Sequence, residues 1–137
     1  MSTTGHIGNE KYVSFTSVKR NGEEVSLPVW IVQLSPSEVA FTSEGNAWKV
    51  KRVRANAHVS LQPCDFRGRV LEGSTKVHGT ARVVTPQENP QDLATVEKAV
   101  KKKYGIVARF VNVSSFLKGV FRRQESNDAA IIVRLSL

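Results

Sequence analysis

The sequence predicts a mainly β, α+β fold in which six antiparallel strands form one barrel and two or three helices are added. Short segments of alternating polarity, rich in β-branched and aromatic residues, recur between turn signals. One segment, residues 89–105, has the pattern of a long helix. In the segment 71–84, one side should carry Val77, Gly79, Ala81 and Val83 and the other side Lys76, His78, Thr80 and Arg82. The small residues there suit a tightly curved sheet.

Length and composition indicate one globular domain. The chain has 137 residues and a mass of 15.1 kDa, enough for one sizeable core. We expect a flexible N-terminal arm over residues 1–10 and a single domain over 11–137. No apolar run reaches the length of a bilayer span, the N-terminus lacks the apolar core of a signal peptide, and the single cysteine, Cys64, excludes an internal disulfide. These features predict a cytoplasmic protein.

Alternation and a turn signal predict the first two strands. Residues 11–18 alternate in polarity and are rich in β-formers, which indicates a half-buried strand. The pair Asn21-Gly22 is typical of two-residue hairpin turns, so the strand at 24–34 should pair antiparallel with the first. Pro28 lies in the middle of that second strand, where it removes a ladder donor. It marks an edge, a bulge or a place where something other than a strand approaches the backbone.

Four more strands and two helices are predicted after this hairpin. The long helix has Asn89 as its N-cap and Pro90 at its first position, and we expect Gly105 to end it. Its buried stripe is expected to consist of Leu93, Val96, Val100 and Tyr104. Lysines 101–103 then lie in its last turn, where solvation and the helix dipole explain them. The strands are expected at 39–42, 58–64, 71–84 and 129–135, and a second, shorter helix at 106–117.

The segment 41–56 organises the rest of the chain, because an apolar strand there runs into a glycine turn and then a short basic helix. Lys49 lies in the first turn of that helix, beside unpaired backbone N–H groups of the kind that bind phosphate. Val50 and Val53 should face the body, with Lys49 and Arg52 on a neighbouring face. Lysine and arginine on short surface helices are more often simply solvated, so two interpretations stay open.

The charge of the chain permits a polyanionic partner. The net charge is +8 and the pI is near 10.0. The basic residues are split among 49–54, 98–103 and 122–123, with no recognition helix, zinc-finger spacing or aromatic-rich binding strand, which argues against nucleic acid. A polyanionic small ligand explains the first cluster equally well. Trp30 offers a large ring, either as a core residue or as the wall of a flat ligand site.

No catalytic set is recognisable in the sequence. The histidines, His6, His58 and His78, are far apart and lack partners at metal-ligand spacing, so no metal site is predicted. Cys64 lacks a nucleophile signature and is interpreted as a buried bystander thiol. Paired carboxylates, a phosphate-binding loop and a dinucleotide fingerprint are also absent. If the protein is an enzyme, its demanding chemistry should belong to a cofactor.

Four segments together resemble a known superfamily: 11–22, 28–30, 42–56 and 63–68. Their order is similar to that of the small enzymes of the pyridoxamine-phosphate-oxidase-like superfamily, and within it to the deazaflavin-dependent branch that binds coenzyme F420. The similarity covers residues 9–137. It implies a six-stranded antiparallel split β-barrel of the FMN-binding type.

The resemblance also implies a site and a partner. Members of the superfamily are homodimers that hold the cofactor in a groove between barrels, with a lysine matching Lys49 on its phosphate and its ring on a strand matching Pro28–Trp30. Lys51 and Arg52 would then meet the phosphate or the acidic glutamyl tail. The expected cofactor-binding residues are Pro28, Val29, Trp30, Thr42, Ser43, Trp48, Lys49, Lys51 and Arg52.

Two departures from the pattern bear on the cofactor. Flavin-binding relatives carry a serine where this chain has Ala47 and an arginine in the strand before it, whereas residues 24–34 hold neither arginine nor lysine. The resemblance therefore favours coenzyme F420 over FMN, which stays the alternative. It implies hydride transfer between the deazaflavin and an enone, a quinone or a similar molecule. A cofactor carrier or sensor without turnover, and a nucleic-acid-binding barrel, are the other hypotheses.

Overall fold

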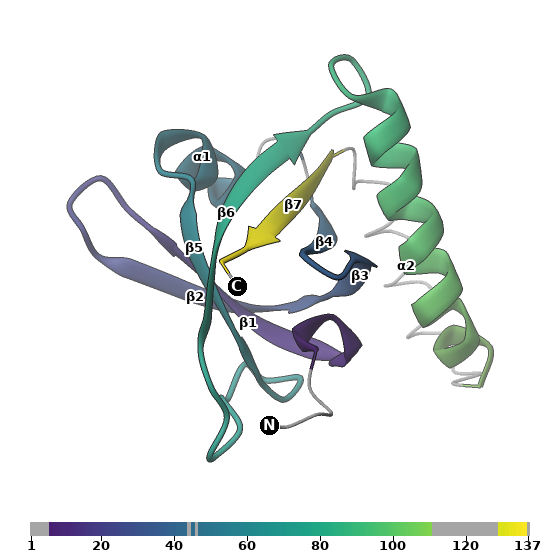
Figure 1. Cartoon of the computed structure of the whole chain (residues 1–137), viewed down its shortest axis with the longest axis horizontal. Helices are drawn as coiled ribbons and strands as arrows, with labels where there is room; N and C mark the ends of the chain where they lie inside the picture. Colours follow the sequence, from purple (N-terminus) through teal and green to yellow (C-terminus); the bar gives the residue numbers. More distant parts are fainter. Residues whose placement is uncertain (1–5, 44, 46, 111–128, 137) are drawn as a thin grey trace.

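The computed structural model describes residues 6–43, 45, 47–110 and 129–136 of the chain. They form a curled sheet of seven strands with a short 3-10 helix and two α-helices (Figure 1). In chain order the elements are η1 (Ile7–Asn9), β1 (Tyr12–Val18), β2 (Glu24–Trp30), β3 (Val32–Ser35), β4 (Glu38–Ser43), α1 (Trp48–Ala55), β5 (His58–Pro63), β6 (Val77–Val84), α2 (Pro90–Phe110) and β7 (Ala129–Leu135).

The sheet curls because its two edge strands are neighbours in the chain. The strand order is β2-β1-β5-β6-β7-β4-β3, with every neighbouring pair antiparallel. Only Ile31 separates β2 from β3, so one continuous segment carries both edges and draws the sheet into a half-barrel. The predicted mainly β, antiparallel barrel is confirmed. Seven strands replace the expected six because the strand predicted at 24–34 breaks at Ile31.

The first hairpin forms as predicted, but with a different turn. Val18 pairs with Glu24, and the backbone of Lys19 bonds that of Glu23 (N–O 2.9 Å). Gly22 has φ of 88°, whereas no non-glycine residue in the described part of the chain has positive φ. A two-residue turn would need positive φ at Asn21 as well, so that prediction was wrong. The edge position predicted from Pro28 is confirmed, because β2 ends the sheet.

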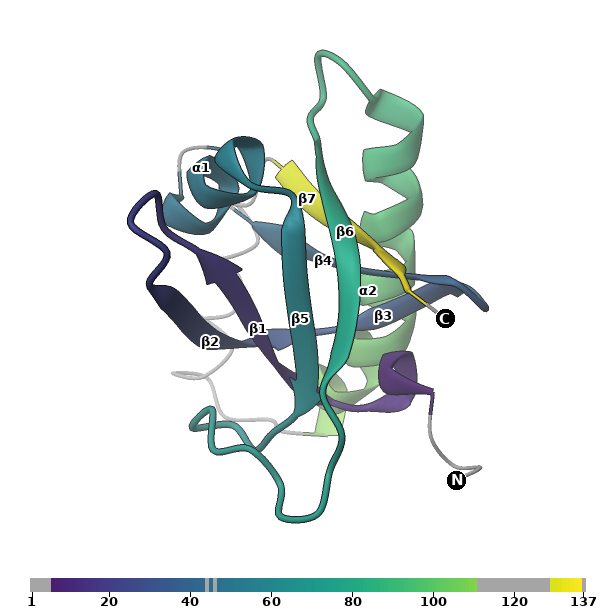
Figure 2. The same cartoon turned by 60° about the vertical axis from the view of Figure 1, so that its left-hand side comes forward.

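Two apolar clusters fill the two sides of the sheet. The first lies inside the curl, around an edge-to-face pair of Phe15 and Phe41 with ring centroids 4.8 Å apart, and it receives the buried valines of α1, Val50 and Val53. Figure 2 shows α1 beside the β1–β2 hairpin and α2 on the far side of the sheet. The second cluster lies under α2 and contains its predicted buried stripe, Leu93, Val96, Val100 and Tyr104.

Helix α2 is longer than predicted. It begins at Pro90, as expected, but runs through Gly105 to Phe110, so the predicted stop was wrong. A single glycine inside a helix costs only about 1 kcal/mol, which packing along the stripe outweighs. Residues 106–110, expected to begin a second helix, belong to α2. The remainder of that predicted helix and the turn expected at 126–128 lie outside the described residues.

Lys103 departs from the solvated role predicted for the lysines of α2. Its Nζ donates to the carbonyl oxygens of Gly8 (2.8 Å), Glu10 (2.5 Å) and Ile31 (2.7 Å). The neighbouring Tyr104 hydroxyl lies 2.6 Å from the same Ile31 oxygen. We call Lys103 and Tyr104 the α2 clamp, because they hold η1 and the β2–β3 break against the helix. Lys101 and Lys102 are exposed as expected.

Two more expectations change at the ends of elements. Residues 6–10 were expected in a flexible arm, yet η1 buries Ile7 and Gly8, and the His6 ring bonds the Pro36 carbonyl at 2.8 Å. The strand predicted at 71–84 is shorter, since β6 begins at Val77. The predicted alternation within β6 is confirmed, because Gly79 and Ala81 are buried whereas His78, Thr80 and Arg82 are exposed. A search of the described helices found none with the length and apolar character needed to span a bilayer.

Candidate functional site

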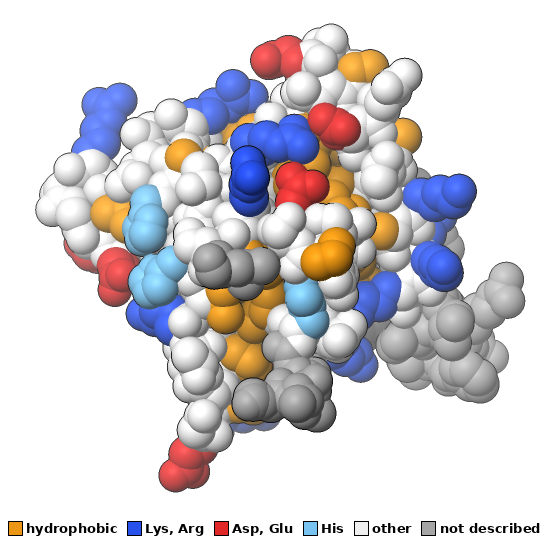
Figure 3. All heavy atoms as spheres, in the orientation of Figure 1, with side chains coloured by type: hydrophobic (Ala, Val, Ile, Leu, Met, Phe, Trp, Pro, Cys, Tyr) orange, Lys and Arg blue, Asp and Glu red, His pale blue; other side chains and the backbone are white. Residues whose placement is uncertain are grey.

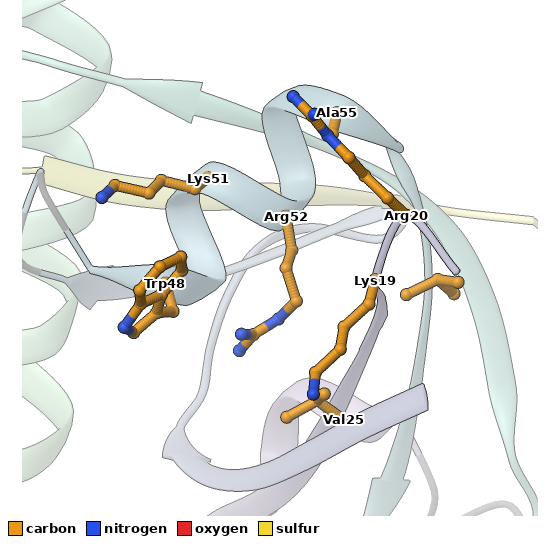
Figure 4. Close-up of a pocket in the computed structure, with 8 residues that line it drawn as sticks. Lys19, Arg20, Val25, Trp48, Lys51, Arg52 and Ala55 are labelled. Carbon is orange, nitrogen blue, oxygen red and sulfur yellow. The ribbon is translucent and has the colours of Figure 1, made fainter. Parts of the chain in front are cut away.

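A hollow of about 640 Å³ opens between helix α1 and the tip of the β1–β2 hairpin. We call it the α1 hollow. Its wall has a helix side and a hairpin side, and each contributes two cations and two apolar or aromatic residues (Figure 4). The lining residues are Val18, Lys19, Arg20, Val25, Trp48, Lys51, Arg52 and Ala55.

The helix presents one face to the hollow for a simple geometric reason. Trp48, Lys51, Arg52 and Ala55 follow the spacing i, i+3, i+4, i+7, which places them on one side of an α-helix. The opposite side is held by buried valines in the first core cluster. Ala47, the N-cap, makes no side-chain cap bond and the first turn carries no acidic residue. The positive end of the helix dipole is therefore not offset within α1.

Arg52 is fixed at one end of its guanidinium. Its Nε donates to the hydroxyl of Ser17 at 2.8 Å, and Ser17, near the end of β1, is fully buried. Among the described residues, no carboxylate lies within ion-pair distance of Arg52. Figure 4 shows its side chain reaching down from α1 toward the hairpin, to the side where Lys19 also points. The terminal nitrogens of Arg52 thus face the hollow from a fixed position.

Trp48 offers a flat and largely uncovered ring. It is 73% exposed, the highest value among the large hydrophobic residues that the structure describes as exposed. The Nζ of Lys51 lies 4.6 Å from the centroid of its ring. A cation at that distance is attracted by the negative face of the indole, by about 0.5–1 kcal/mol at an exposed site. The pair forms a mixed aromatic and cationic rim for the hollow.

The hairpin side adds positive charge with little compensation. Lys19 and Arg20 line the hollow from the turn. Lys19 lies 3.7 Å from the Glu23 carboxylate, but both side chains are about half exposed (47% and 61%), so the pair contributes at most about 1 kcal/mol. Among the described residues, no acidic side chain lines the hollow. The site as a whole therefore favours an anionic ligand.

The structure brings three of the expected cofactor-binding residues together and leaves three nearby ones outside the lining. Trp48, Lys51 and Arg52 share the hollow. Lys49 is half-buried on α1 but does not line it, and neither does Thr42 or Ser43 at the end of β4, where Ser43 is 2% exposed. The placement of a phosphate on Lys49 stays a prediction.

The expected ring platform, Pro28–Trp30, lies farther away along β2. Val25 lines the hollow, whereas Trp30 is at the other end of the strand, paired with Tyr12. The Trp30 ring stacks on Tyr104 of the α2 clamp, with centroids 4.6 Å apart and planes at 12°. Val29 is buried in the first core cluster. These contacts agree with the interpretation of Trp30 as a packing residue. Its role as the wall of a ligand site stays a prediction.

The predicted burial of Cys64 is confirmed, and two histidines lie closer together than their sequence separation suggests. Cys64 is 5% exposed, and burial, aided by the charge of Asp65, raises the pKa of its thiol to about 11, so the thiolate is suppressed. His58 and His78, far apart in sequence, stack on adjacent strands with ring centroids 5.4 Å apart. The space-filling view shows adjoining histidines on this face (Figure 3). No group of three metal-ligand side chains occurs among the described residues.

Solved structures give the relationship of the fold. A variant of HupZ from Group A Streptococcus aligns over 96% of this chain and 89% of its own, with 14% identity and a TM-score of 0.62. A protein named F420 reductase aligns over 96% and 90%, with 14% identity and a TM-score of 0.56. A Listeria innocua protein named for pyridoxamine 5′-phosphate oxidase aligns over 93% and 86%, with 15% identity and a TM-score of 0.60.

The chain has a split β-barrel fold. No protein-family model and no curated protein sequence matches it. The fold expected from the resemblance is confirmed, but the deazaflavin branch is not singled out, because differently named split barrels align about equally well. Within this split barrel, sequence reasoning missed the hairpin half of the site. A usable signal was present in Lys19-Arg20, two cations directly before the predicted turn.

Proposed function

We propose that this split barrel binds coenzyme F420 in the α1 hollow and transfers a hydride between that cofactor and an electron-poor small molecule, such as an enone or a quinone. The observation that carries the proposal is the hollow, where an exposed indole stands beside four cationic side chains. A planar ring with a phosphate and an acidic tail would meet both features. The similar fold of a protein named F420 reductase supports the choice.

The residues present fit such a cofactor in size and charge. The hollow, at about 640 Å³, lies within the range of about 300–1,000 Å³ usual for ligand pockets. The fixed guanidinium of Arg52 suits a phosphate oxygen pair. Lys19, Arg20 and Lys51 give enough further charge for an acidic tail. FMN, with one phosphate and no such tail, is the alternative and would use fewer of these cations.

The chain's own part in the reaction would be binding and orientation. When bound, the deazaflavin supplies a hydride, so the protein needs no redox group of its own. The cations would hold the anionic end and Trp48 would contact the ring, which limits its motion relative to a substrate. None of the eight lining residues is a carboxylate, imidazole, thiol or phenol. We therefore assign no proton donor.

That same absence within the lining favours a second candidate, a cofactor carrier or sensor without turnover. A carrier needs only the binding surface, whereas a reductase also needs room for a substrate beside the ring. The two candidates share every prediction about cofactor affinity. They differ only in whether the bound, reduced cofactor is oxidised by an acceptor.

Titration of the purified protein with coenzyme F420 and with FMN, followed by ring fluorescence, tests the site. We expect saturable binding, tighter for F420, that weakens as salt is raised because the ligand is held by charge. Single-stranded DNA of similar total charge serves as the comparison ligand. Tighter binding of DNA than of either cofactor would replace the proposal with a nucleic-acid function.

Turnover is tested separately with reduced F420 and a panel of quinones and enones, monitored by the return of the oxidised deazaflavin absorbance. The reductase requires oxidation that depends on both protein and acceptor. Binding without any acceptor-dependent oxidation across the panel would favour the carrier or sensor.

The proposal includes a homodimer with the cofactor groove completed by a second protomer. Three large apolar side chains in the loop after β5 are exposed, namely Phe66 (64%), Val70 (47%) and Leu71 (45%). Exposed apolar residues grouped in this way are typical of association surfaces. Sedimentation of the protein at several concentrations tests the dimer, and Phe66→Ser should weaken it.

A further inference from the structure

We propose that Ser17 is the positioning residue for the anionic group of the ligand: its buried hydroxyl fixes Arg52 so that the guanidinium presents its two terminal nitrogens to a phosphate oxygen pair. The inference deepens the proposed function and rests on it for the identity of the ligand. It concerns a residue of β1 that does not itself line the hollow.

The geometry gives the hydroxyl one specific role. Ser17 lies on the face of β1 that turns Val13 and Phe15 into the first core cluster, and it is fully buried. A buried hydroxyl in an apolar neighbourhood is costly unless it is hydrogen-bonded. Its described side-chain partner is Arg52, whose Nε donates to it at 2.8 Å. Ser17 therefore lies in the core, and its hydroxyl contacts the Arg52 side chain that lines the α1 hollow.

The Arg52 nitrogen that bonds Ser17 determines which guanidinium donors remain for a ligand. Guanidinium carries five N–H donors in a planar fork, and Ser17 occupies only the Nε donor. The donors on the two terminal nitrogens stay available from a fixed plane, which suits a bidentate phosphate or carboxylate. An arginine without this anchor would sample several rotamers, and ordering it on binding would cost affinity. Ser17 therefore reduces the entropy lost when the anion binds.

Neighbouring cations cannot take over this role in the same way. Lys51 is engaged over the Trp48 ring, and Lys19 is near Glu23. Both are lysines, which act as point charges and give no fixed plane. The other arginine of the lining, Arg20, is exposed, and no hydrogen bond among the described residues fixes the plane of its guanidinium. Specificity for a planar oxygen pair over a simple halide should therefore come from the Ser17–Arg52 unit.

The test compares ligands that share a ring but differ in the phosphate. Affinities are measured for coenzyme F420 and its phosphate-free ring alcohol, and for FMN and riboflavin, in the wild type and in Ser17→Ala. We expect Ser17→Ala to weaken the phosphate-bearing ligands about 5-fold and to leave the neutral ligands within 2-fold. In an Arg52→Ala background the same change should have no further effect, because the residue acts through the guanidinium.

A matched control and an independent probe complete the design. Thr16→Val, one residue away on β1, removes a hydroxyl that bonds Ser26 at 2.6 Å rather than Arg52, and should leave all affinities unchanged. Inorganic pyrophosphate should raise the melting temperature of the wild type more than that of Ser17→Ala.

The possible results separate this inference from the proposed function. A Ser17-dependent effect of pyrophosphate without any cofactor binding supports the anion site and overturns the F420 assignment. Cofactor binding with equal losses for charged and neutral ligands in Ser17→Ala, or with no loss at all, overturns the role of Ser17 and leaves the function standing. Failure of F420, FMN and pyrophosphate to bind overturns both.

Discussion

The α2 clamp and the α1 hollow place a lysine beside an aromatic ring in two opposite ways. In the clamp, three backbone carbonyls receive the Lys103 ammonium and the neighbouring Tyr104 ring stacks on Trp30. In the hollow, Lys51 lies over the largely exposed Trp48 ring, and no carboxylate or backbone acceptor of the described residues contacts its ammonium. The first pair is satisfied within the chain, whereas the second leaves donors and ring surface for something else.

This difference distinguishes a cation that bonds the protein's own backbone from cations that remain open to a ligand, which charge alone does not. Burial lowers the pKa of Lys103, as expected of a cation withdrawn from water, and the carbonyls that surround it come from two separate segments, η1 with its C-cap and the β2–β3 break. An ammonium with three donors on three protein acceptors has no capacity left for a ligand. Removal of a clamp residue should therefore change stability and not affinity, and removal of a hollow residue should mainly change affinity.

The largest effect is expected for Lys103→Met, which keeps most of the side-chain volume but removes the ammonium. The carbonyl oxygens of Gly8 and Glu10 lose their side-chain donor and that of Ile31 keeps only Tyr104, so we expect the free energy of unfolding to fall by about 3 kcal/mol. Urea unfolding followed by circular dichroism measures the loss. Cofactor affinity should stay unchanged, because α1, which lines the hollow, and α2, which carries the clamp, pack on opposite sides of the sheet (Figure 2).

Lys102→Ala is the matched control for the clamp. Lys102 precedes Lys103 on the same helix but is exposed, so its removal should change the free energy of unfolding by less than about 0.5 kcal/mol. Equal losses from the two lysines would mean that helix charge, rather than the carbonyl contacts, sets the stability of this region.

Arg52→Ala should produce the next largest effect, on the other side of the comparison. Loss of a charge-assisted, bidentate contact should weaken binding of coenzyme F420 by about 2 kcal/mol. The free energy of unfolding should fall by about 1 kcal/mol, less than for Lys103→Met, because the buried Ser17 hydroxyl loses one hydrogen bond. Fluorescence titration gives the affinity.

Lys49→Ala tests the competing prediction from the sequence, in which Lys49 holds the phosphate. A greater loss from Lys49→Ala than from Arg52→Ala would move the anionic end away from the lining face of α1.

Trp48→Ala should have a smaller effect on the same measurement. The ring is 73% exposed, so the folded state loses little when it is removed. A stacked aromatic contact to a planar ligand is worth about 0.5–1.5 kcal/mol, and affinity for F420 and for its neutral ring alcohol should fall by that amount together. A loss confined to the phosphate-bearing form would show that Trp48 acts through Lys51 and not through the ring.

The parts of the fold that depend on local patterns could be predicted from the sequence. The stripe of α2, the alternation of β6 and the burial of Val50 and Val53 follow from periodicity, and each is confirmed. The break at Ile31 was not predictable in this way. Its carbonyl serves Lys103 and Tyr104, which are more than 70 residues away, so the reason for ending β2 there is long-range.

The same distinction applies to the candidate site. The resemblance suggested Trp48, Lys51 and Arg52, the three expected residues that line the hollow. Helical spacing alone grouped Arg52 with Lys49, which does not line it. The hairpin half and the Ser17–Arg52 contact were not predicted, because the local sequence does not show which strand end packs beside α1. Sequence reasoning also assigned Lys103 to solvent, since three lysines in a row near a helix end look alike until the rest of the chain packs against them.

The smallest expected effect sharpens the clamp side and depends on pH. The Tyr104 hydroxyl reaches the carbonyls of Lys11 (2.8 Å) and Ile31 (2.6 Å), so Tyr104→Phe should cost about 1 kcal/mol at pH 8. Burial raises the pKa of Tyr104 above its usual range, so the folded state keeps this proton after the unfolded state has lost it. The stabilisation is then complete below about pH 10 and declines above it, by up to about 1.4 kcal/mol per pH unit.

Unfolding of the wild type and of Tyr104→Phe at pH 8, 10 and 11 should show the difference between their free energies of unfolding shrinking and then reversing. A difference that stays constant to pH 11 would mean that the hydroxyl reaches water, and that the clamp is less closed than its contacts indicate.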